Sequence, residues 1–161
     1  MAVDSFIKIQ GHDGESKDAK HKNQIDILSW SWGLSQTGDF HRGGGGGAGK
    51  VNINNLTFSK WIDISTPSLM LACANGEHIP KAELFVRKAG KDALEYIVFT
   101  MEKVIVSGIR LGNSGDESVM ETITLNFAKL EFKYVEQGEK GSEKGKKTFK
   151  WDVEENKGDV S

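Results

Sequence analysis

The chain has 161 residues, of which 37% are hydrophobic and 27% are charged, and this is the composition of one soluble globular domain. The formal net charge is −2, which argues against a general nucleic-acid binder because such a protein needs a basic face to neutralise phosphates. Cys73 is the only cysteine, so a disulfide within the chain and a cluster of cysteine ligands around a metal are excluded.

No segment predicts stable insertion into a membrane or a cleavable leader. None approaches the roughly 20 consecutive apolar residues that a membrane-spanning helix needs. The first ten residues lack the basic segment and long apolar run of a secretory signal peptide. We therefore expect either a cytoplasmic protein or one exported by a machinery that reads no signal peptide.

The first part of the chain predicts two strands separated by a loop. Residues 4–10 form the first strand, and the polar residues 11–23 form the loop. Residues 25–35 alternate between large apolar and small polar side chains, which is the period of a strand with one buried face. The expected buried side chains are Leu28, Trp30, Trp32 and Leu34, and the expected outer side chains are Ser29, Ser31, Gly33 and Ser35.

A glycine-dense segment interrupts the strand pattern. Residues 37–50 predict a flexible loop and contain five consecutive glycines, Gly43–Gly47. Strand character resumes over residues 51–61. A bulge or tight bend is expected at Asn54–Asn55, because the apolar positions change phase there.

Residues 65–76 predict a short helix. Thr66 can cap its start, Pro67 suits the first helical position, and Gly76 suits its end. A helix of about nine residues is too short to be stable alone, so we expect it to dock on the sheet. Its expected apolar stripe consists of Leu69, Met70, Ala72 and Cys73.

The second half of the chain predicts three strand regions. They cover residues 82–88, residues 94–111 with a kink near Glu102–Lys103, and residues 119–135. In the last region the apolar set changes face at Ala128. A strand with such a phase switch is expected to bend at a bulge and to pass between two sheets.

The C-terminal segment predicts one more strand. Residues 136–147 are rich in Gly, Lys and Glu and are expected to form a polar linker, residues 148–153 a last strand, and the remaining tail a frayed end. Seven or eight strands and one helix are expected in all. The pattern thus predicts a single domain over residues 1–161 that is mainly β, a two-sheet β-barrel or sandwich with one short α-helix.

No motif in the chain predicts an enzyme or a cofactor. Gly44–Lys50 has the spacing of a phosphate-binding loop, but Val51 stands where a Ser or Thr should bind magnesium, and a strand follows in place of a helix. The Gly-x-Ser-x-Gly motif of hydrolases is absent. Cys73 lies on the apolar stripe of the helix and is predicted to be a small core residue.

The histidines predict no metal site, because none is spaced three or four residues from another and none lies near the cysteine. We expect all of them to be exposed in loops. They are His12, His21, His41 and His78.

Two of the predicted strands present outer faces of small polar side chains. Ser29 and Ser31 form one of these faces, and Thr122 and Thr124 form the other. Such a face suits plain solvent or the wall of a wide water-filled channel, and the alternation by itself favours solvent.

Several motifs that occur in one order carry a resemblance to a known family. They are Met1–Ile9, Gly14–Asp18, Trp30–Gly33, His41–Lys50, Ser65–Pro67 with the helix that follows, Arg87–Gly90 and Thr124–Ala128. Over about residues 1–135 the chain resembles the haemolysin co-regulated protein (Hcp) family of bacterial type VI secretion systems. Residues 136–147 depart from that family in composition.

The resemblance implies a structural protein that assembles. Family membership would mean two sheets forming a β-barrel with a short helix, six subunits closing into a ring, and rings stacking into an inner tube. A contractile sheath drives such a tube out of the cell, and a spike protein forms its tip. Small effectors ride in the lumen. The implied partners are therefore further copies of the chain, effectors, the spike and the sheath, and export needs no signal peptide.

The implied architecture changes the reading of two features. Ser29, Ser31, Thr122 and Thr124 become candidates for the lumen wall. The glycine-rich loop becomes a candidate arm that reaches an adjacent subunit or ring and is ordered on assembly. Its candidate contact residues are His41, Gly43, Gly44, Gly45, Gly46, Gly47 and Gly49.

Three other readings of the sequence stay open. A phage tail-tube subunit would use a similar fold in a similar way. A monomeric β-barrel that binds a small molecule would need an internal cavity, which the large aromatic side chains look sufficient to fill. An enzyme has only the imperfect phosphate-loop spacing in its favour.

Overall fold

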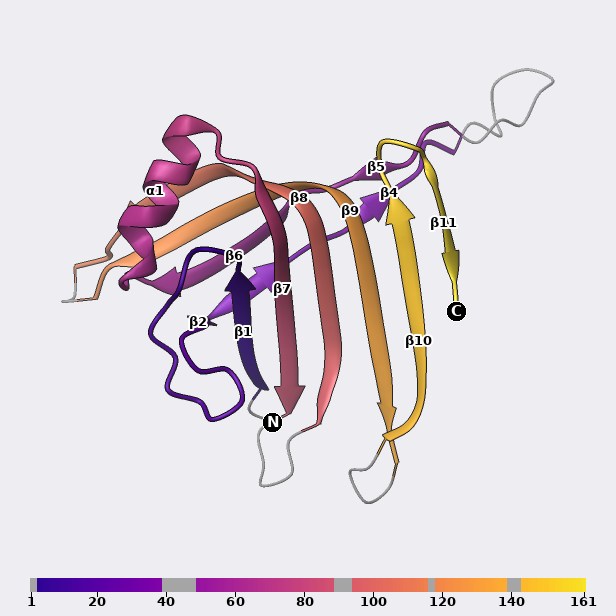
Figure 1. The fold of residues 1–161 in the computed structure, drawn as a ribbon, viewed down its shortest axis with the longest axis horizontal. Coiled ribbons are helices and arrows are strands. Elements are labelled where there is room, and N and C mark those ends of the chain that lie inside the picture. The colour runs from indigo at the N-terminus through magenta and orange to yellow at the C-terminus, as the bar shows by residue number, and fades with distance from the viewer. Residues whose placement is uncertain (1–2, 39–48, 89–93, 116–117, 139–142) are drawn as a thin grey trace.

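The computed structural model of the chain describes residues 3–38, 49–88, 94–115, 118–138 and 143–161. These residues form eleven strands and one helix (Figure 1). In chain order the elements are β1 (Val3–Ile9), β2 (Ile25–Ile27), β3 (Ser29–Ser31), β4 (Leu34–Ser35), β5 (Asn52–Ile53), β6 (Leu56–Trp61), α1 (Ser65–Asn75), β7 (Ile79–Lys88), β8 (Glu95–Gly112), β9 (Met120–Gln137), β10 (Glu143–Asp152) and β11 (Lys157–Val160).

Nine of the eleven strands form one folded antiparallel sheet in two layers. The main layer has the order β11-β10-β9-β8-β7-β1-β2, and a second layer is built where β6 pairs with β9 and β3 pairs with β6. The short strands β4 and β5 pair with each other and project from the body as an arm (Figure 1). The sheet does not close, so of the two expected architectures the sandwich is the one that the chain adopts, with α1 beside it.

The long hairpin of β8 and β9 belongs to both layers. The first half of β8, up to Val104, pairs with β7, whereas residues 105–112 pair with β9 alone among the described strands. The first half of β9 pairs with β6 through Leu125, and its second half pairs with β10 from Lys129 onward. The sheet therefore turns a corner along this hairpin.

Local irregularities in β8 and β9 produce the corner. Lys103 has a positive φ of 54°, a conformation that a regular strand does not contain. On β9 the buried set runs through Ile123, Leu125 and Phe127 and resumes at Leu130, so the strand changes its buried face. Both the kink near Glu102–Lys103 and the phase switch at Ala128 were predicted and are confirmed.

The core lies between the two layers and under α1. Phe99 is fully buried at its centre, with the rings of Trp32, Phe127 and Phe132 edge-on at centroid distances of 5.0, 5.9 and 5.9 Å. Such edge-to-face contacts are a favoured aromatic geometry. Leu69 of α1 is buried in the same cluster, which confirms that the helix docks on the sheet.

The helix starts by a different device from the one predicted. The carboxylate Oδ1 of Asp63 accepts a hydrogen bond from the backbone N–H of Ser65 at 2.9 Å, while the hydroxyl of Thr66 is used in a buried network described below. The helix ends as predicted, because Gly76 adopts the left-handed conformation with φ 67°. Met70 is exposed, so the buried stripe is narrower than expected.

The segment 25–35 differs from the single strand that its alternation predicted. It is divided into β2, β3 and β4, and the break falls at Leu28, whose backbone N–H donates to the carbonyl of Ser59 at 2.8 Å. Because side chains alternate along a strand, a shift of one residue moves those that follow to the other face of the sheet. Ile25 and Ile27 are consequently buried before the break, whereas Leu28 and Leu34 are about half exposed.

The C-terminal segment is more regular than its composition predicted. β9 extends to Gln137 and β10 begins at Glu143, so both ends of the expected linker 136–147 are strand. The tail expected to fray forms β11, which pairs with β10. A Cβ atom at Gly158 would collide with the carbonyl of Lys150 and the ring of Trp151, so glycine permits this close pairing.

Candidate functional site

The register of four strands brings small polar side chains onto one outer face. Ser29, Ser59, Thr122 and Arg110 lie side by side across β3, β6, β9 and β8. The next row consists of Ser31, Thr57, Thr124 and Gly108. We call these eight residues the polar face. All four predicted lumen candidates belong to it, although their proposed role is not tested by this arrangement.

The polar face is fixed by what lies behind it. Trp30, Phe58 and Ile123 alternate with its residues and point into the core, so the hydroxyl-bearing positions must point outward. The hydroxyls of Ser29 and Ser59 lie 2.5 Å apart and are hydrogen-bonded. Arg110 carries the one charge among the eight residues. The surface is therefore smooth, hydrophilic and nearly uncharged.

Thr57 and Ser59 were not among the sequence candidates. A signal for them existed, because Leu56, Phe58 and Lys60 are buried while the residues between them are not. That alternation resembles the one used for Ser29 and Ser31. The pairing of β6 between β3 and β9, which makes the three strands one surface, could not be read from spacing.

The two ends of the polar face differ in chemistry. At one end Ser31, Thr57 and Thr124 border a shallow hollow whose other side is formed by Asn54 and Asn55. At the opposite end lie apolar side chains that are nearly half exposed. These are Trp61, Leu111 and Met120.

A buried charged cluster supports the polar face from inside. The Nζ atom of Lys60 lies 2.6 Å from the carboxylate of Glu121 and 2.9 Å from that of Asp63, and Lys60 and Glu121 are fully buried. The hydroxyl of Thr66 donates to Glu121 at 2.8 Å. The cluster thus ties the start of α1 to β6 and β9, and sequence analysis missed it because neither residue has a distinctive spacing.

The glycine-loop candidates fall largely outside the described residues. His41 and Gly43–Gly47 are in that position, so their predicted contact role stays a prediction. Gly49 is described and exposed, and a side chain there would collide with the hydroxyl of Thr37. The two chain segments at the base of the loop therefore lie together, at the end of the arm formed by β4 and β5.

The prediction that the histidines are exposed is wrong for two of them. His12 and His21 are only 7% and 3% exposed, whereas His78 is exposed. His41 lies outside the described residues. The two buried rings lie in the loop between β1 and β2. Three of their four ring nitrogens are hydrogen-bonded to distant parts of the chain, and the Nδ1 of His21 is hydrogen-bonded to Gln24 in the same loop. In the described part of the chain, no group of three or more His, Cys, Asp or Glu residues is placed to hold a metal.

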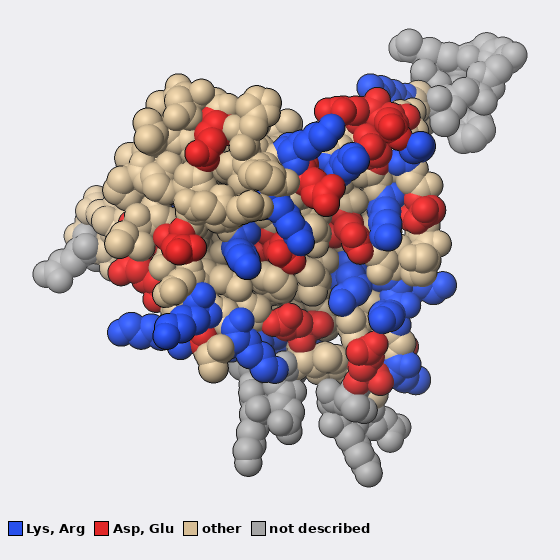
Figure 2. All heavy atoms as spheres, viewed as in Figure 1, with Lys and Arg blue, Asp and Glu red and all other residues tan. Residues whose placement is uncertain are grey.

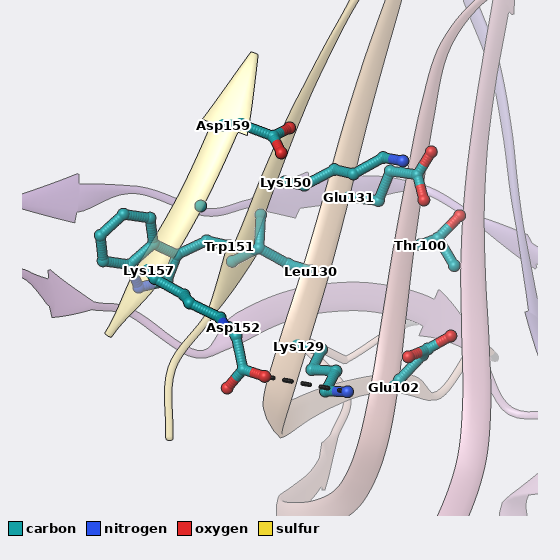
Figure 3. A pocket seen from close by; sticks show the side chains of 11 residues that line it. Thr100, Glu102, Lys129, Leu130, Glu131, Lys150, Trp151, Asp152, Lys157 and Asp159 are labelled. Carbon is teal, nitrogen blue, oxygen red and sulfur yellow. Dashed lines mark ion pairs between the residues drawn. The ribbon is translucent and has the colours of Figure 1, made fainter. Parts of the chain in front are cut away.

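The main layer has an outer face of the opposite character. Cross-strand neighbours on β7 to β11 alternate in charge along the row Lys81, Glu102, Lys129, Asp152 and Lys157. Figure 2 shows this mixture of positive and negative side chains over the sheet. All of these residues except Lys81 help to line a shallow groove of about 350 Å³, in which Lys129 and Asp152 are 3.8 Å apart (Figure 3). Exposed pairs of this kind contribute little to stability.

Comparison with known proteins assigns the chain to a class. The family model described as "Type VI secretion system effector, Hcp" matches residues 6–134, a range that contains the whole polar face. The chain belongs to the Hcp family, the tube proteins of the type VI secretion system, which are secreted. No helix in the described ranges is long and apolar enough to cross a membrane.

Individual relatives cover nearly the whole chain. "Protein hcp1" of Pseudomonas aeruginosa is 49% identical over 159 residues, and the match covers 97% of this chain and 98% of that protein. The solved structure of Hcp1 from Salmonella typhimurium has a TM-score of 0.81 at 40% identity and covers 99% of this chain and 100% of its own. A structure titled as a type six secretion system protein reaches a TM-score of 0.91 at 29% identity, over 98% and 100% of the two chains.

Proposed function

We propose that six copies of this chain close into a ring with the polar face turned inward, and that the rings stack into a tube that carries small effectors. Membership of the Hcp family supports the tube. The observation that carries the ring is that the polar face lies between two strand edges that have no partner among the described residues.

The two edges belong to β3 and to the second half of β8. β3 pairs only with β6, and residues 105–112 of β8 pair only with β9. Open edges pair with other strands unless something blocks them. If the β3 edge of one copy meets the β8 edge of the next, the polar face continues from copy to copy, and a rotation that closes gives a ring.

The chemistry of the polar face suits the inside of such a ring. Small hydroxyl groups present no deep pocket and little charge, so different cargo proteins could pass without being held by strong ion pairs. The charged face of the main layer lies on the opposite side of the sandwich. In this arrangement it faces outward, toward the sheath, and the spike caps the stack.

The remaining expectations follow from the same proposal. The protein acts by assembly, without catalysis and without a cofactor. It resides in the cytoplasm before export and leaves through the secretion machine without a signal peptide. Its partners are other copies of the chain, effectors, the spike and the sheath, and nucleic acid is not among them.

Native mass spectrometry at several protein concentrations tests the ring. We expect a dominant species of about six times 17.7 kDa, because one head-to-tail interface repeated around a closed ring saturates all edges. A monomer at every concentration would refute the ring and would redirect attention to the interior of the sandwich as a ligand site.

A further inference from the structure

The loop between β1 and β2 is fastened to the body at four points. We call residues 11–24 the strap; in Figure 1 it hangs beside β1, below α1. Backbone hydrogen bonds close it on itself, from Gly14 to Asn23 and from Asn23 to Ser16, both at 2.8 Å. Its outward contacts reach α1, β7 and β8, which are far away in the sequence.

Two of the fastenings hold the strap to the helix. The Nε2–H of His12 donates to the carboxylate of Glu77 at 2.6 Å, and its Nδ1 is hydrogen-bonded to the hydroxyl of Ser68 at 2.5 Å. The carboxylate of Glu15 accepts from the backbone N–H of Ile64 at 2.9 Å. The strap is therefore linked to both ends of α1.

The other two fastenings hold the strap to the main layer. Arg87 of β7 donates from both terminal nitrogens to the carboxylate of Asp18. His21 is hydrogen-bonded through Nε2 to the carboxylate of Glu95 on β8 and through Nδ1 to Gln24, 2.9 Å away.

The strap covers an apolar part of the outer face. The ring of His21 stacks on Phe6 at 4.5 Å between centroids and lies 4.9 Å from Phe85. The guanidinium of Arg87 lies over the same Phe6 ring at 5.0 Å. Phe6 and Phe85 are neighbours in the β1–β7 register, so lifting the strap would uncover a pair of aromatic side chains.

We propose that the strap is an acid-released latch, which opens while the sandwich stays folded and exposes the apolar surface of Phe6 and Phe85. Every fastening contains a carboxylate. Carboxylates lose their charge in acid, whereas imidazoles carry a proton there. Protonation of Glu77 and Glu95 would leave His12 and His21 as buried cations without a counter-charge, and an uncompensated buried charge is strongly destabilising.

Further charged groups surround the strap. Besides Glu77 and Glu95, the groups facing it are Asp4, Asp26 and Arg87 on neighbouring strands. The hydrogen bond from Arg87 holds the pKa of Asp18 below its ordinary value. A carboxyl group whose pKa is lowered by folding stabilises the folded state at a pH above its unfolded-state pKa. This stabilisation is fully lost only when the pH falls through the lowered pKa. The Asp18 fastening should thus persist at a pH below the ordinary carboxyl pKa.

The buried cation of the core has more counter-charges than the buried histidines of the strap. Lys60 contacts two carboxylates, Glu121 and Asp63, so loss of one negative charge leaves the other. The strap is therefore expected to open at a higher pH than the sheet unfolds. The inference concerns the free subunit and the ring alike, and it does not depend on the proposed lumen.

Hydrogen exchange followed by mass spectrometry across pH 7 to 3, corrected for the intrinsic rate, tests the latch on the full chain. We expect peptides from the strap to lose protection about one pH unit before peptides from β8 and β9. An apolar dye should bind in the same range. Simultaneous loss of protection in strap and sheet, or a strap that stays protected until the sheet unfolds, would overturn the proposal.

Two substitutions separate a latch from a merely structural contact. Glu95→Gln leaves a hydrogen-bond partner but no counter-charge for His21, so the opening pH should rise by about one unit. His21→Gln removes the buried cation, so the opening pH should fall. Glu155→Gln, which removes only an exposed ion pair with Lys157, is the control and should change nothing. Shifts of both test variants in the same direction would contradict the proposal.

Discussion

Adjacent residues on β6 and β9 point to opposite faces of the sheet. Ser59 and Thr122 point outward on the polar face, while Lys60 and Glu121, their neighbours in the sequence, point inward and form a fully buried ion pair. The pair costs desolvation, and one oxygen of Glu121 has no hydrogen-bond partner among the described residues. The ion pair fixes α1 to the sheet, because both of its members are hydrogen-bonded to Thr66.

Removing one partner of this pair should be costly. We expect Lys60→Met to lower the free energy of unfolding by about 3–5 kcal/mol, because Glu121 would stay buried without its counter-charge. Urea denaturation of the purified variant measures this loss. Lys144→Met, which breaks an exposed pair with Glu136, is the control and should cost less than about 1 kcal/mol. A loss for Lys60→Met as small as the control's would mean that the cluster is not coupled as described.

A single side chain on the polar face should control cargo. Ser31 is exposed and lies beside Thr57, so Ser31→Gln should fold and assemble normally but crowd the proposed lumen wall. We expect the ring to persist in native mass spectrometry while the amount of co-purified effector falls. Lys150→Gln, on the opposite charged face, should retain its effector. Unchanged effector retention in Ser31→Gln would count against the lumen assignment.

At the scale of elements, the β8–β9 hairpin is the part on which the architecture depends. It takes part in both layers, and its kink at Lys103 and change of face after Phe127 turn one sheet into a sandwich. The arm of β4 and β5 depends on far fewer contacts, since it is only two residues long on each side. The hairpin therefore serves the fold, and the arm is free to serve assembly.

Deletion of residues 43–49 should separate these two roles. A surface loop contributes little to the core, and the segments at its base already lie together. We expect an unchanged thermal midpoint and an intact ring, together with weaker stacking of rings. Sedimentation and electron microscopy at matched protein concentrations measure the stacking. If the deletion variant forms tubes at the same protein concentration as the full chain, the loop has no role in stacking.

At the scale of the whole molecule, the sandwich has two outer faces of different chemistry. The polar face presents hydroxyl groups and one charge, while the main layer presents alternating Lys, Asp and Glu side chains. A closed ring of such subunits would place these surfaces on its two sides. This division explains how one chain could pass cargo inside and present charge to other proteins outside.

The sequence by itself determined the features that depend on neighbouring residues. Alternation identified most strands and the outward direction of Ser29, Ser31, Thr122 and Thr124, and the run of motifs identified the family. The helix end at Gly76 and the kink near Lys103 were also predicted. These signals are local, because strand and helix periods and turn chemistry act over a few residues.

The tertiary structure decided which local features meet. Only strand pairing showed that Thr57 and Ser59 complete the polar face, and that a polar tail becomes β11 because β10 offers it a partner. Only packing buried His12 and His21 against α1, β1, β7 and β8, and Lys60 against Glu121. Burial and pairing depend on residues 50 or more positions apart in several of these contacts, and a single sequence contains no spacing rule that links such positions.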